Sequence, residues 1–464
     1  MNIYTLKSTL KEIVSGMEKK VPYACALAME TLGERVVVMT KESRIEPLDP
    51  SRGVVFTAFT GRQFLEYSTG DLTPDGLNKA AKELVRLAEL SGIAGIGGDV
   101  TIDPGPAIER DFEVPEVIPN ASVSLSDKVN RCSVYREKLQ GMDSRIVNAA
   151  AIYAHTRNRE LYVNRNKALF QDLKRGQAVI QAVMRDGDDN AQLHAGDSKQ
   201  GGYENSTIPA AKFAELVHDC GRILNAPRLA PGYYDCIFSP EFAGITAHEA
   251  FGHGTESDMF LKDRCRGAEY LGKRVGSDLV NMFDSPAEPG EAASFFFDHE
   301  GQLASRTQII KDGILVSPIT ELNSATRLGL VRTANGRRES YERKAYARMT
   351  NTYFGPGTNT FEEMVASIKS GYLLTHPSNG MEDPKGWGIQ LEGYIAEEIL
   401  DGKLTGMVHT PVIVTGYVPE LLQSISMVGD TASIFGLGYC GKGHKEWVKV
   451  TDGGPYLKLK ARLG

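Results

Sequence analysis

The stretch IVNAAAIYAHTRNRELYVNRNKALFQDLKRGQAVIQAVMR, residues 146–185, is dominated by residues that favour β-strands. Three strand-like runs, IVNAAAIYAHT, ELYVNRNKALFQDL and QAVIQAVMR, are separated by short groups of polar residues that are typical of turns. Short breaks of this kind join antiparallel neighbours. The stretch therefore predicts an antiparallel meander of three strands.

The residues before this stretch alternate between helical and strand-like patterns. Prolines at 104, 106, 115 and 119 disfavour regular structure between Gly97 and Asn120, which predicts a long connection. Ser126 is expected to cap a helix after that connection. The other predicted elements are helices at 5–19, from 77 and at 209–224, and a strand at 23–39.

The residues after the stretch are rich in strands and contain two hairpin signals. Asp312-Gly313 and Asp401-Gly402 each lie between strand-like runs, and Asp-Gly favours the positive φ angles of a tight turn. The segment NAPRLAPGYYD, from Asn225, predicts a domain boundary because it places two prolines and a glycine between helix and strand. We expect an α+β fold with mixed or antiparallel sheets and flanking helices, in two domains. These are an N-terminal domain of residues 1–228 and a strand-rich C-terminal domain of residues 229–464.

The overall composition limits the classes of molecule that the protein is expected to bind. A net charge of −7 and an isoelectric point near 5.8 disfavour binding to nucleic acids or membrane surfaces, which are polyanionic. The segment MNIYTLKSTLKEIVSG lacks the apolar core of a signal peptide, and no apolar run is long enough for a membrane span. Six scattered cysteines form no C-x-x-C pair, so reduced thiols and a cytoplasmic location are expected.

The segment ITAHEAFGHGTESD, residues 245–258, is similar to the zinc-protease motif H-E-x-x-H but has one additional residue. Ser239-Pro240-Glu241 predicts that a helix begins just before it. In a regular α-helix, the side chains of His248 and His253 would differ by about 140° in direction. A π-bulge, which the flanking glycines would ease, would let the two side chains converge. A chance spacing of two ordinary histidines is the alternative.

An open catalytic zinc site takes three protein ligands, so a third donor is needed. Nearby candidates are Glu256, Asp258 and Cys265, and the two acids could instead hold a ligand histidine in one tautomer. The distant candidate is Cys440 in IFGLGYCGKGHKEW, where glycines allow the backbone to pass close to another element. A buried free cysteine in a turn is the alternative for Cys440.

These segments resemble the TldD/TldE family, also called PmbA or modulator of DNA gyrase, and in particular its TldD-type subunit. HEAFGHGTESD is similar to the HExxxH segment of the active subunit, and YCGKGH is similar to the segment that supplies a cysteine ligand. Between them, FFFDHEGQLASRTQIIKDGIL, NGRRESYERKAYARMTNTYF and the LEGYIAEEILDGKL region follow the order of the family. The resemblance covers most of residues 230–450. It departs at His299, where the family leads us to expect an acidic residue.

The resemblance implies a zinc metallopeptidase that hydrolyses short or unfolded peptides at a site enclosed by two subunits. It assigns His248, His253 and Cys440 as the zinc ligands and Glu249 as the general base. Zinc accepts nitrogen and sulfur ligands and polarises the scissile carbonyl, while a nearby carboxylate can take the proton of the attacking water. One zinc ion per active subunit is expected, in a dimer with a TldE-type partner or with a second copy of this chain.

Further candidates lie near these motifs. Arg338, Tyr341 and His444 could stabilise the oxyanion of the transition state, given their residue types and their positions in family-like segments. A solvated basic run is the alternative for Arg337, Arg338 and Arg343. His444 could alternatively orient the cysteine loop.

Two other classes of function fit part of the pattern. A deformylase-like hydrolase of small amides also combines two histidines, a cysteine and a glutamate, but such enzymes have the shorter H-E-x-x-H. A non-catalytic interaction protein of the gyrase-modulator type could use zinc only to stabilise its fold. Structural zinc sites, however, are more often closed by four ligands.

Overall fold

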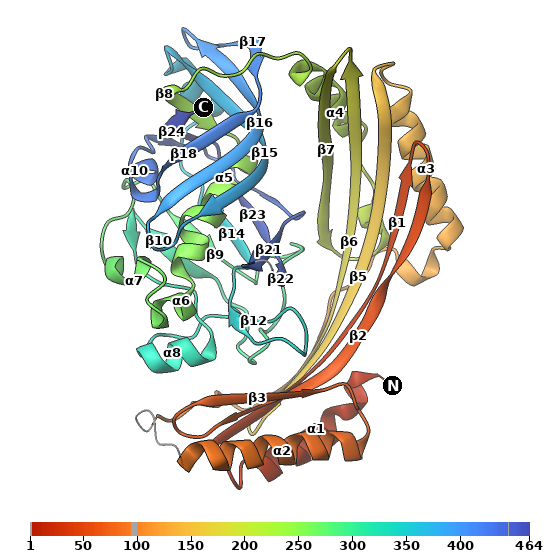
Figure 1. Cartoon of the computed structure of the whole chain (residues 1–464), viewed down its shortest axis with the longest axis vertical. Coiled ribbons are helices and arrows are strands. Elements are labelled where there is room, and N and C mark those ends of the chain that lie inside the picture. Colours follow the sequence, from red (N-terminus) through yellow and green to blue (C-terminus); the bar gives the residue numbers. More distant parts are fainter. Residues whose placement is uncertain (1, 94–99, 444) are drawn as a thin grey trace.

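The computed structural model describes residues 2–93, 100–443 and 445–464, and its fold is α+β, as predicted. Its first part is a long, curved sheet of seven strands, the N-terminal sheet, which runs along one side of the molecule (Figure 1). The strand order is β3-β2-β1-β5-β6-β4, and β7 pairs with β6. The strands are β1 (Tyr23–Met39), β2 (Ser43–Phe59), β3 (Phe64–Thr69), β4 (Ile108–Glu113), β5 (Ile146–Asn164), β6 (Lys167–Asp186) and β7 (Asp189–Gln200).

The predicted meander is present, but its strands are longer than expected. The turn falls at Arg165-Asn166, inside the second run, so the three runs form only β5 and β6, and β7 is the third strand. The polar groups interpreted as turns lie within the sheet. Arg157 can do so because it pairs with Asp172 of the neighbouring strand. The cross-strand ion pair thus compensates the charge of Arg157 within the sheet, as water would at an exposed turn.

Two predictions about the preceding segment were wrong in part. Within the described residues of the predicted connection, β4 forms a strand because it pairs in parallel with β6, and the prolines lie on either side of it. Residues 97–99 of that connection lie outside the described residues. The helix expected at Ser126 is capped by Ser124, whose side chain accepts from the backbone N–H of Asp127. The sheet is covered by α1 (Lys7–Met17), α2 (Pro74–Ile93), α3 (Leu125–Gln140) and α4 (Ala210–Ile223).

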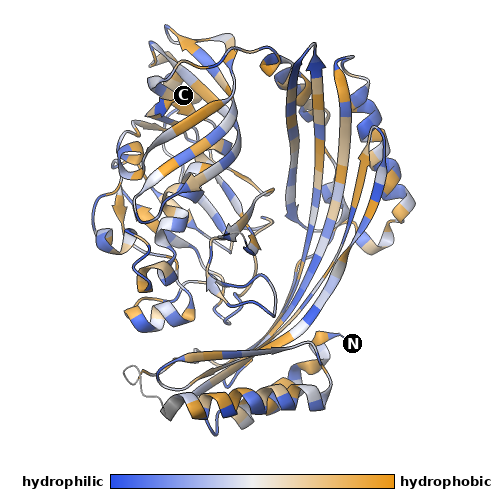
Figure 2. Cartoon of the chain, viewed as in Figure 1, coloured by the Kyte–Doolittle hydropathy of each residue, from blue (hydrophilic) through white to orange (hydrophobic). Residues whose placement is uncertain are grey.

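The C-terminal half contains a closed barrel, as β15 pairs with both β8 and β16 in the order β15-β8-β24-β18-β16. The Asp401-Gly402 turn joins barrel strand β16 to the attached strand β17 with φ angles of 47° and 74°, which confirms that hairpin prediction. Hydrophobic and hydrophilic residues alternate along the barrel strands, as Figure 2 shows. The strands are β8 (Gly232–Phe238), β15 (Ser370–Glu382), β16 (Gly388–Leu400), β18 (Val412–Tyr417) and β24 (Leu457–Leu463), with β17 (Lys403–His409) and β19 (Met427–Val428) attached.

A second C-terminal sheet has the order β11-β10-β9-β14-β23-β20. The Asp312-Gly313 hairpin is its first turn and is also confirmed. Its strands are β9 (Met282–Asp284), β10 (Thr307–Lys311), β11 (Ile314–Leu315), β14 (Asn351–Phe354), β20 (Ser433–Phe435) and β23 (Thr451–Gly454). Two small hairpins complete the strands, β12 (Gly336–Arg337) with β13 (Tyr346–Ala347) and β21 (Tyr439–Lys442) with β22 (Lys445–Lys449).

The helix α5 (Pro240–Ala247) lies in the core between barrel strand β15 and strands β14 and β23 of the second sheet. Its buried residues Phe242, Ala243 and Ala247 belong to one hydrophobic cluster that includes residues of both layers. Because both sheets pack on it, the position of α5 is fixed from two sides. The remaining helices are α6 (Ser257–Leu261), α7 (Gly267–Tyr270), α8 (Leu322–Leu328), α9 (Phe361–Ala366) and α10 (Val418–Gln423). Among the described residues, no helix combines the length and apolar character needed to cross a membrane.

Candidate metal centre

The predicted helix start and the predicted π-bulge are both present. The Ser239 side chain accepts from the backbone N–H of Phe242, and Pro240 occupies the first turn of α5. The chain then forms a π-helix, η4 (His248–Gly252), in which the N–H of His253 donates to the carbonyl of His248. The five-residue bond brings the two histidine rings onto one side, with ring centres 5.1 Å apart. The extra residue of the motif is therefore absorbed by the helix.

The third predicted residue joins the two histidines from the β21–β22 hairpin. The Sγ atom of Cys440 lies 3.2 Å from Nε2 of His248 and 3.3 Å from Nε2 of His253. One donor atom from each residue lies within 4.8 Å of the other two, so the three form a compact group. All three are largely shielded from solvent. We call these residues the His-His-Cys cluster.

The charges within the His-His-Cys cluster support one another. Burial opposes ionisation of the Cys440 thiol, but the two histidines outweigh it and hold its pKa well below the ordinary value. Burial likewise opposes protonation of the histidines, yet the thiolate raises the pKa of both, and Glu256 adds to this at His253. The cluster therefore favours a thiolate beside protonated imidazoles, a state in which a divalent cation can replace the protons.

The donor set fits zinc, which binds thiolate sulfur and imidazole nitrogen in preference to oxygen-only sites. Both histidines direct Nε2 to the cluster, and Nδ1 of His248 is shielded without a hydrogen-bond partner. Two alternative ligands from the sequence are engaged elsewhere. Cys265 donates to the carbonyl of Gly254, 2.6 Å away, and Asp258 pairs with Lys442 at 2.5 Å. The ligand roles of His248, His253 and Cys440 remain predictions.

Glu256, another proposed alternative, supports His253 from outside the cluster. Its Oε2 lies 3.4 Å from Nδ1 of His253, which favours the tautomer whose Nε2 is free. The carboxylate is itself held by Arg348 and Lys442, each at 3.2 Å. Arg348 also donates to the backbone carbonyl of Cys440, 2.9 Å away. One buried ion network thus connects the histidine to the cysteine hairpin.

Glu249, the predicted base, lies on η4 and is largely buried. Within the part of the chain that the structure describes, its carboxylate forms no hydrogen bond or ion pair, so it can accept a proton. Strand β15 passes directly beneath it. A Cβ atom at Gly380 would lie 2.6 Å from Cγ of Glu249, which shows how closely the strand limits the position of the carboxylate.

Sequence reasoning missed a second carboxyl group beside the cluster, that of Glu382 at the end of β15. Both oxygens are shielded from solvent and lack a partner, and Oε1 lies 3.1 Å from where a Cβ at Gly254 would stand. Burial, together with nearby Glu249 and Glu256, raises its pKa well above the ordinary value despite the opposing charge of His253. Glu382 lies in an ordinary hairpin sequence, and nothing in that sequence indicated that its carboxyl group would lie beside the cluster.

Arg338 and Tyr341, two of the three candidates for oxyanion stabilisation, are not brought to the cluster. Arg338 pairs with Glu66 of β3 at 2.8 Å, and the Tyr341 ring lies against Gly53 of β2. His444 lies outside the described residues. Arg338 is 4% exposed, so the solvated-run interpretation is wrong for it. It is also wrong for Arg337, which is buried, whereas Arg343 is exposed.

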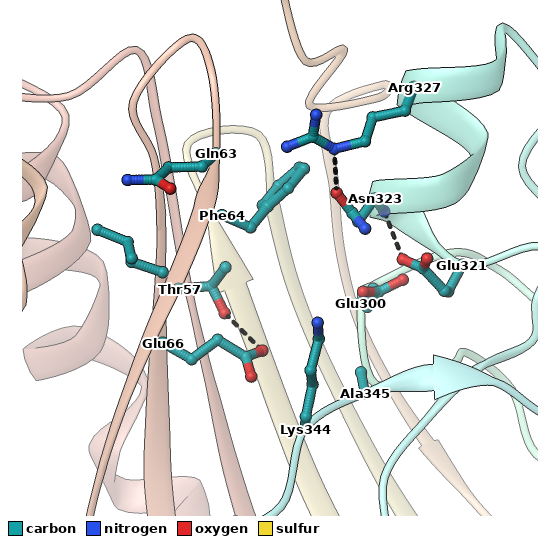
Figure 3. Close-up of a pocket in the computed structure, with 11 residues that line it drawn as sticks. Thr57, Gln63, Phe64, Glu66, Glu300, Glu321, Asn323, Arg327, Lys344 and Ala345 are labelled. Carbon is teal, nitrogen blue, oxygen red and sulfur yellow. Dashed lines mark hydrogen bonds between the residues drawn. The ribbon is translucent and has the colours of Figure 1, made fainter. Parts of the chain in front are cut away.

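A cavity of about 410 Å³ lies near this contact, between the N-terminal sheet and α8 (Figure 3). Its walls include Phe64 and Glu66 on one side and Glu300, Glu321 and Lys344 on the other, and no residue of the His-His-Cys cluster lines it. His299, the departure from the family pattern, is close by and pairs with Glu160 at 3.2 Å. These residues join the two halves of the molecule.

Comparisons with known proteins agree with the resemblance seen in the sequence. The PmbA/TldA metallopeptidase C-terminal domain matches residues 231–461. A metalloprotease of Methanothermobacter thermautotrophicus is 26% identical over 97% of both chains. A zinc metalloprotease TldD homolog of Saccharolobus solfataricus is 29% identical over 65% of this chain and 68% of its own. The fold is similar to that of TldE from Thermococcus kodakarensis, with a TM-score of 0.76, 16% identity and coverage of 98% and 99%.

Proposed function

Because the chain belongs to the TldD/PmbA family, whose related proteins are named metalloproteases, we propose that it is a zinc-dependent metallopeptidase of the TldD type. The observation that carries this proposal is the convergence of His248, His253 and Cys440 on one point. Its substrates are short or unfolded peptides, because a cluster this enclosed admits an extended chain more readily than a folded protein surface.

In this proposal His248, His253 and Cys440 hold one zinc ion. When bound, zinc supplies Lewis acidity toward the scissile carbonyl and makes a water molecule more acidic. Glu249 takes the proton from the attacking water and returns it to the leaving amine, and its buried position on η4, next to the ligand His248, supports this role. Gly380 leaves the space that the Glu249 side chain occupies, and Glu256 keeps Nε2 of His253 available.

The rival functions fit the site less well. A purely structural zinc would be expected in a closed set of four ligands, and the described residues contribute three to this cluster. Deformylase-like chemistry is disfavoured because deformylases have the shorter H-E-x-x-H motif. This chain has one residue more between its histidines, and η4 accommodates it. We further propose that the chain acts in the cytoplasm as a dimer with a TldE-type subunit or a second copy, and that a domain boundary lies between α4 and β8.

The deciding experiment measures zinc content and peptide cleavage in the purified protein and in two variants. Glu249→Gln is expected to keep about one zinc per chain and lose at least about a hundredfold in kcat. Cys440→Ala is expected to lose both zinc and activity. Each protein is assayed alone and with a TldE-type subunit, because half of the enclosure could come from the partner.

Cys265→Ala is the matched control, because Cys265 is buried nearby but bonds to Gly254 instead of joining the cluster. It should keep zinc and activity. Loss of zinc in Cys265→Ala together with retention in Cys440→Ala would refute the ligand assignment. A zinc-loaded protein that cleaves no peptide, with or without a partner, would refute the peptidase. Normal folding of the protein after chelation would exclude the purely structural zinc.

A further inference from the structure

The cavity between the N-terminal sheet and α8 is large enough to hold a small molecule (Figure 3). Its volume of about 410 Å³ lies within the range of small-molecule sites, roughly 300–1,000 Å³. Residues of β2 and β3 form the wall on the sheet side, and α8 and the residues that precede α8 and β13 form much of the facing wall. We call it the α8 cavity. A molecule bound there would contact both halves of the chain.

Part of the wall of the α8 cavity is apolar. Phe64 and Leu65 of β3 line it from the sheet side, and Ala345 lines it from the other half. Figure 3 shows the Phe64 ring directed from β3 towards α8. An apolar group of a ligand would therefore have a surface to pack against.

The negative charge of the cavity wall is centred on Glu300. The backbone N–H of Leu322 donates to its Oε2 over 2.6 Å, but no described residue donates to its Oε1. Burial, followed by the charges of Glu321 and Asp298, raises the pKa of Glu300 well above its ordinary value, and Arg332 opposes this shift. A cation bound at Oε1 would relieve the repulsion among these carboxylates.

The positive charge of the wall comes from Lys344. Among the described residues, its exposed ammonium group has no hydrogen-bond or ion-pair partner. Nζ lies 5.7 Å from the ring centre of Tyr346, at the outer limit of a cation–π contact. Figure 3 shows the Lys344 side chain extended into the cavity, with its ammonium directed towards the side where Glu300 lies. The two groups are nevertheless too far apart to form an ion pair with each other.

The α8 cavity thus combines an unpaired ammonium, a carboxylate oxygen without a donor and an apolar wall. An inorganic anion would match Lys344 but not Glu300, and a simple amine would match Glu300 but not Lys344. At neutral pH, an α-amino acid or a short peptide carries both an ammonium and a carboxylate group. Molecules of this class complement all three features of the wall.

We propose that the α8 cavity binds a zwitterionic α-amino acid or short peptide, with its ammonium on Glu300, its carboxylate on Lys344 and an apolar side chain against Phe64. Both polar contacts are charge-assisted hydrogen bonds, which are stronger than neutral ones. A peptidase releases molecules of this class, so the source of the ligand rests on the proposed function. The site itself does not.

Calorimetry with three uncleavable probes tests the site. The zinc-loaded protein is titrated with leucine, with isocaproate, which lacks the ammonium group, and with isoamylamine, which lacks the carboxylate. Leucine should bind at least about tenfold more tightly than either of the other two, because each of them loses one charge-assisted contact. Absence of leucine binding, or equal affinity for the three probes, would overturn the proposal.

Two variants assign the contacts. Lys344→Met should remove the preference for leucine over isoamylamine, and Glu300→Gln should remove the preference for leucine over isocaproate. Glu300→Gln keeps an oxygen that can accept from the N–H of Leu322, and Lys344 is exposed, so both variants should fold. Lys311→Met, at an exposed lysine of β10 that does not line the cavity, is the control and should bind leucine as the wild type does. Unchanged leucine affinity in both test variants would contradict the proposed contacts.

Urea denaturation gives a second measurement that does not depend on catalysis. A ligand that binds only the folded chain stabilises it, so leucine should raise the urea midpoint of the wild type but not that of Lys344→Met. Leucine binding that persists in Lys344→Met and disappears in Cys440→Ala would place leucine at the zinc ion and overturn the proposal. If the protein cleaves no peptide, the peptidase is refuted, and the two binding measurements still decide whether the cavity is a site.

Discussion

At the scale of single residues, Glu256 has the clearest supporting role. It accepts from His253 and is held by Arg348 and Lys442. Glu256→Gln keeps the shape but weakens the acceptor and removes the ion pair of Arg348, whereas Lys442 keeps its pair with Asp258. We expect zinc affinity, measured by competition with a chelator, to fall roughly 10- to 100-fold. Glu269→Gln, an exposed acid on α7, should leave affinity unchanged, and equal losses in both variants would contradict the role of Glu256.

The titration of the same residues predicts how zinc binding depends on pH. Since the thiolate overcomes burial and raises the pKa of His248 and His253, each imidazole carries a proton to higher pH than usual. Zinc must displace these protons, so its apparent affinity should rise with pH up to the raised pKa values and level off above them. Calorimetry in buffers of different ionisation enthalpy should record proton release on zinc binding near neutral pH. Zinc affinity independent of pH would contradict the prediction.

At the scale of elements, the close contact between β15 and η4 predicts a defect in catalysis without loss of metal. In Gly380→Ala the new Cβ would lie 2.6 Å from Cγ of Glu249 and 3.0 Å from Cγ1 of Ile245, so Glu249 must move. A displacement of about 1 Å can cost on the order of a hundredfold in rate. We expect kcat to fall 10- to 100-fold, as a rough estimate, while zinc content is unchanged. Gly388→Ala on β16, with no atom within 4 Å of the new Cβ, is the control.

Helices, turns and strands were predictable from the sequence where a local signal fixes the backbone. They were less predictable where the pairing residue or strand is distant in the chain. The cap at Ser239, the two Asp-Gly hairpins and the π-bulge depend on residues within one turn, and the structure contains each of them. The run through Arg157 was divided wrongly because its compensating partner, Asp172, lies on another strand. Strand β4 was missed for the same reason, since its partner β6 follows α3 and β5 in the chain.

At the scale of the whole molecule, the sequence predicted which residues come together in the His-His-Cys cluster, but not the environment around them. The motif and the resemblance selected Cys440, far from His248 in the chain, and the fold brings the two within 3.2 Å. Glu382 had no such signature. It gains its character from burial without a partner, and burial depends on every neighbouring element. Arg338 was misplaced because its charge is matched by Glu66, on the other sheet.

The contact between the N-terminal sheet and the C-terminal half of the chain can be tested at Gly53 of β2, which lies against the Tyr341 ring. A Cβ there would lie 2.2–2.5 Å from atoms of the Tyr341 ring, including the ring carbon nearest the backbone, so the segment carrying Tyr341 would have to shift. Gly53→Ala should therefore lower the free energy of unfolding by about 1–3 kcal/mol in urea denaturation. In a Tyr341→Ala background the same change should cost close to nothing, because the clashing ring is gone. Gly16→Ala, on the exposed side of α1 with open space around it, should instead stabilise by up to about 1 kcal/mol. An equal cost for Gly53→Ala in both backgrounds would mean that the Tyr341 ring does not form the contact.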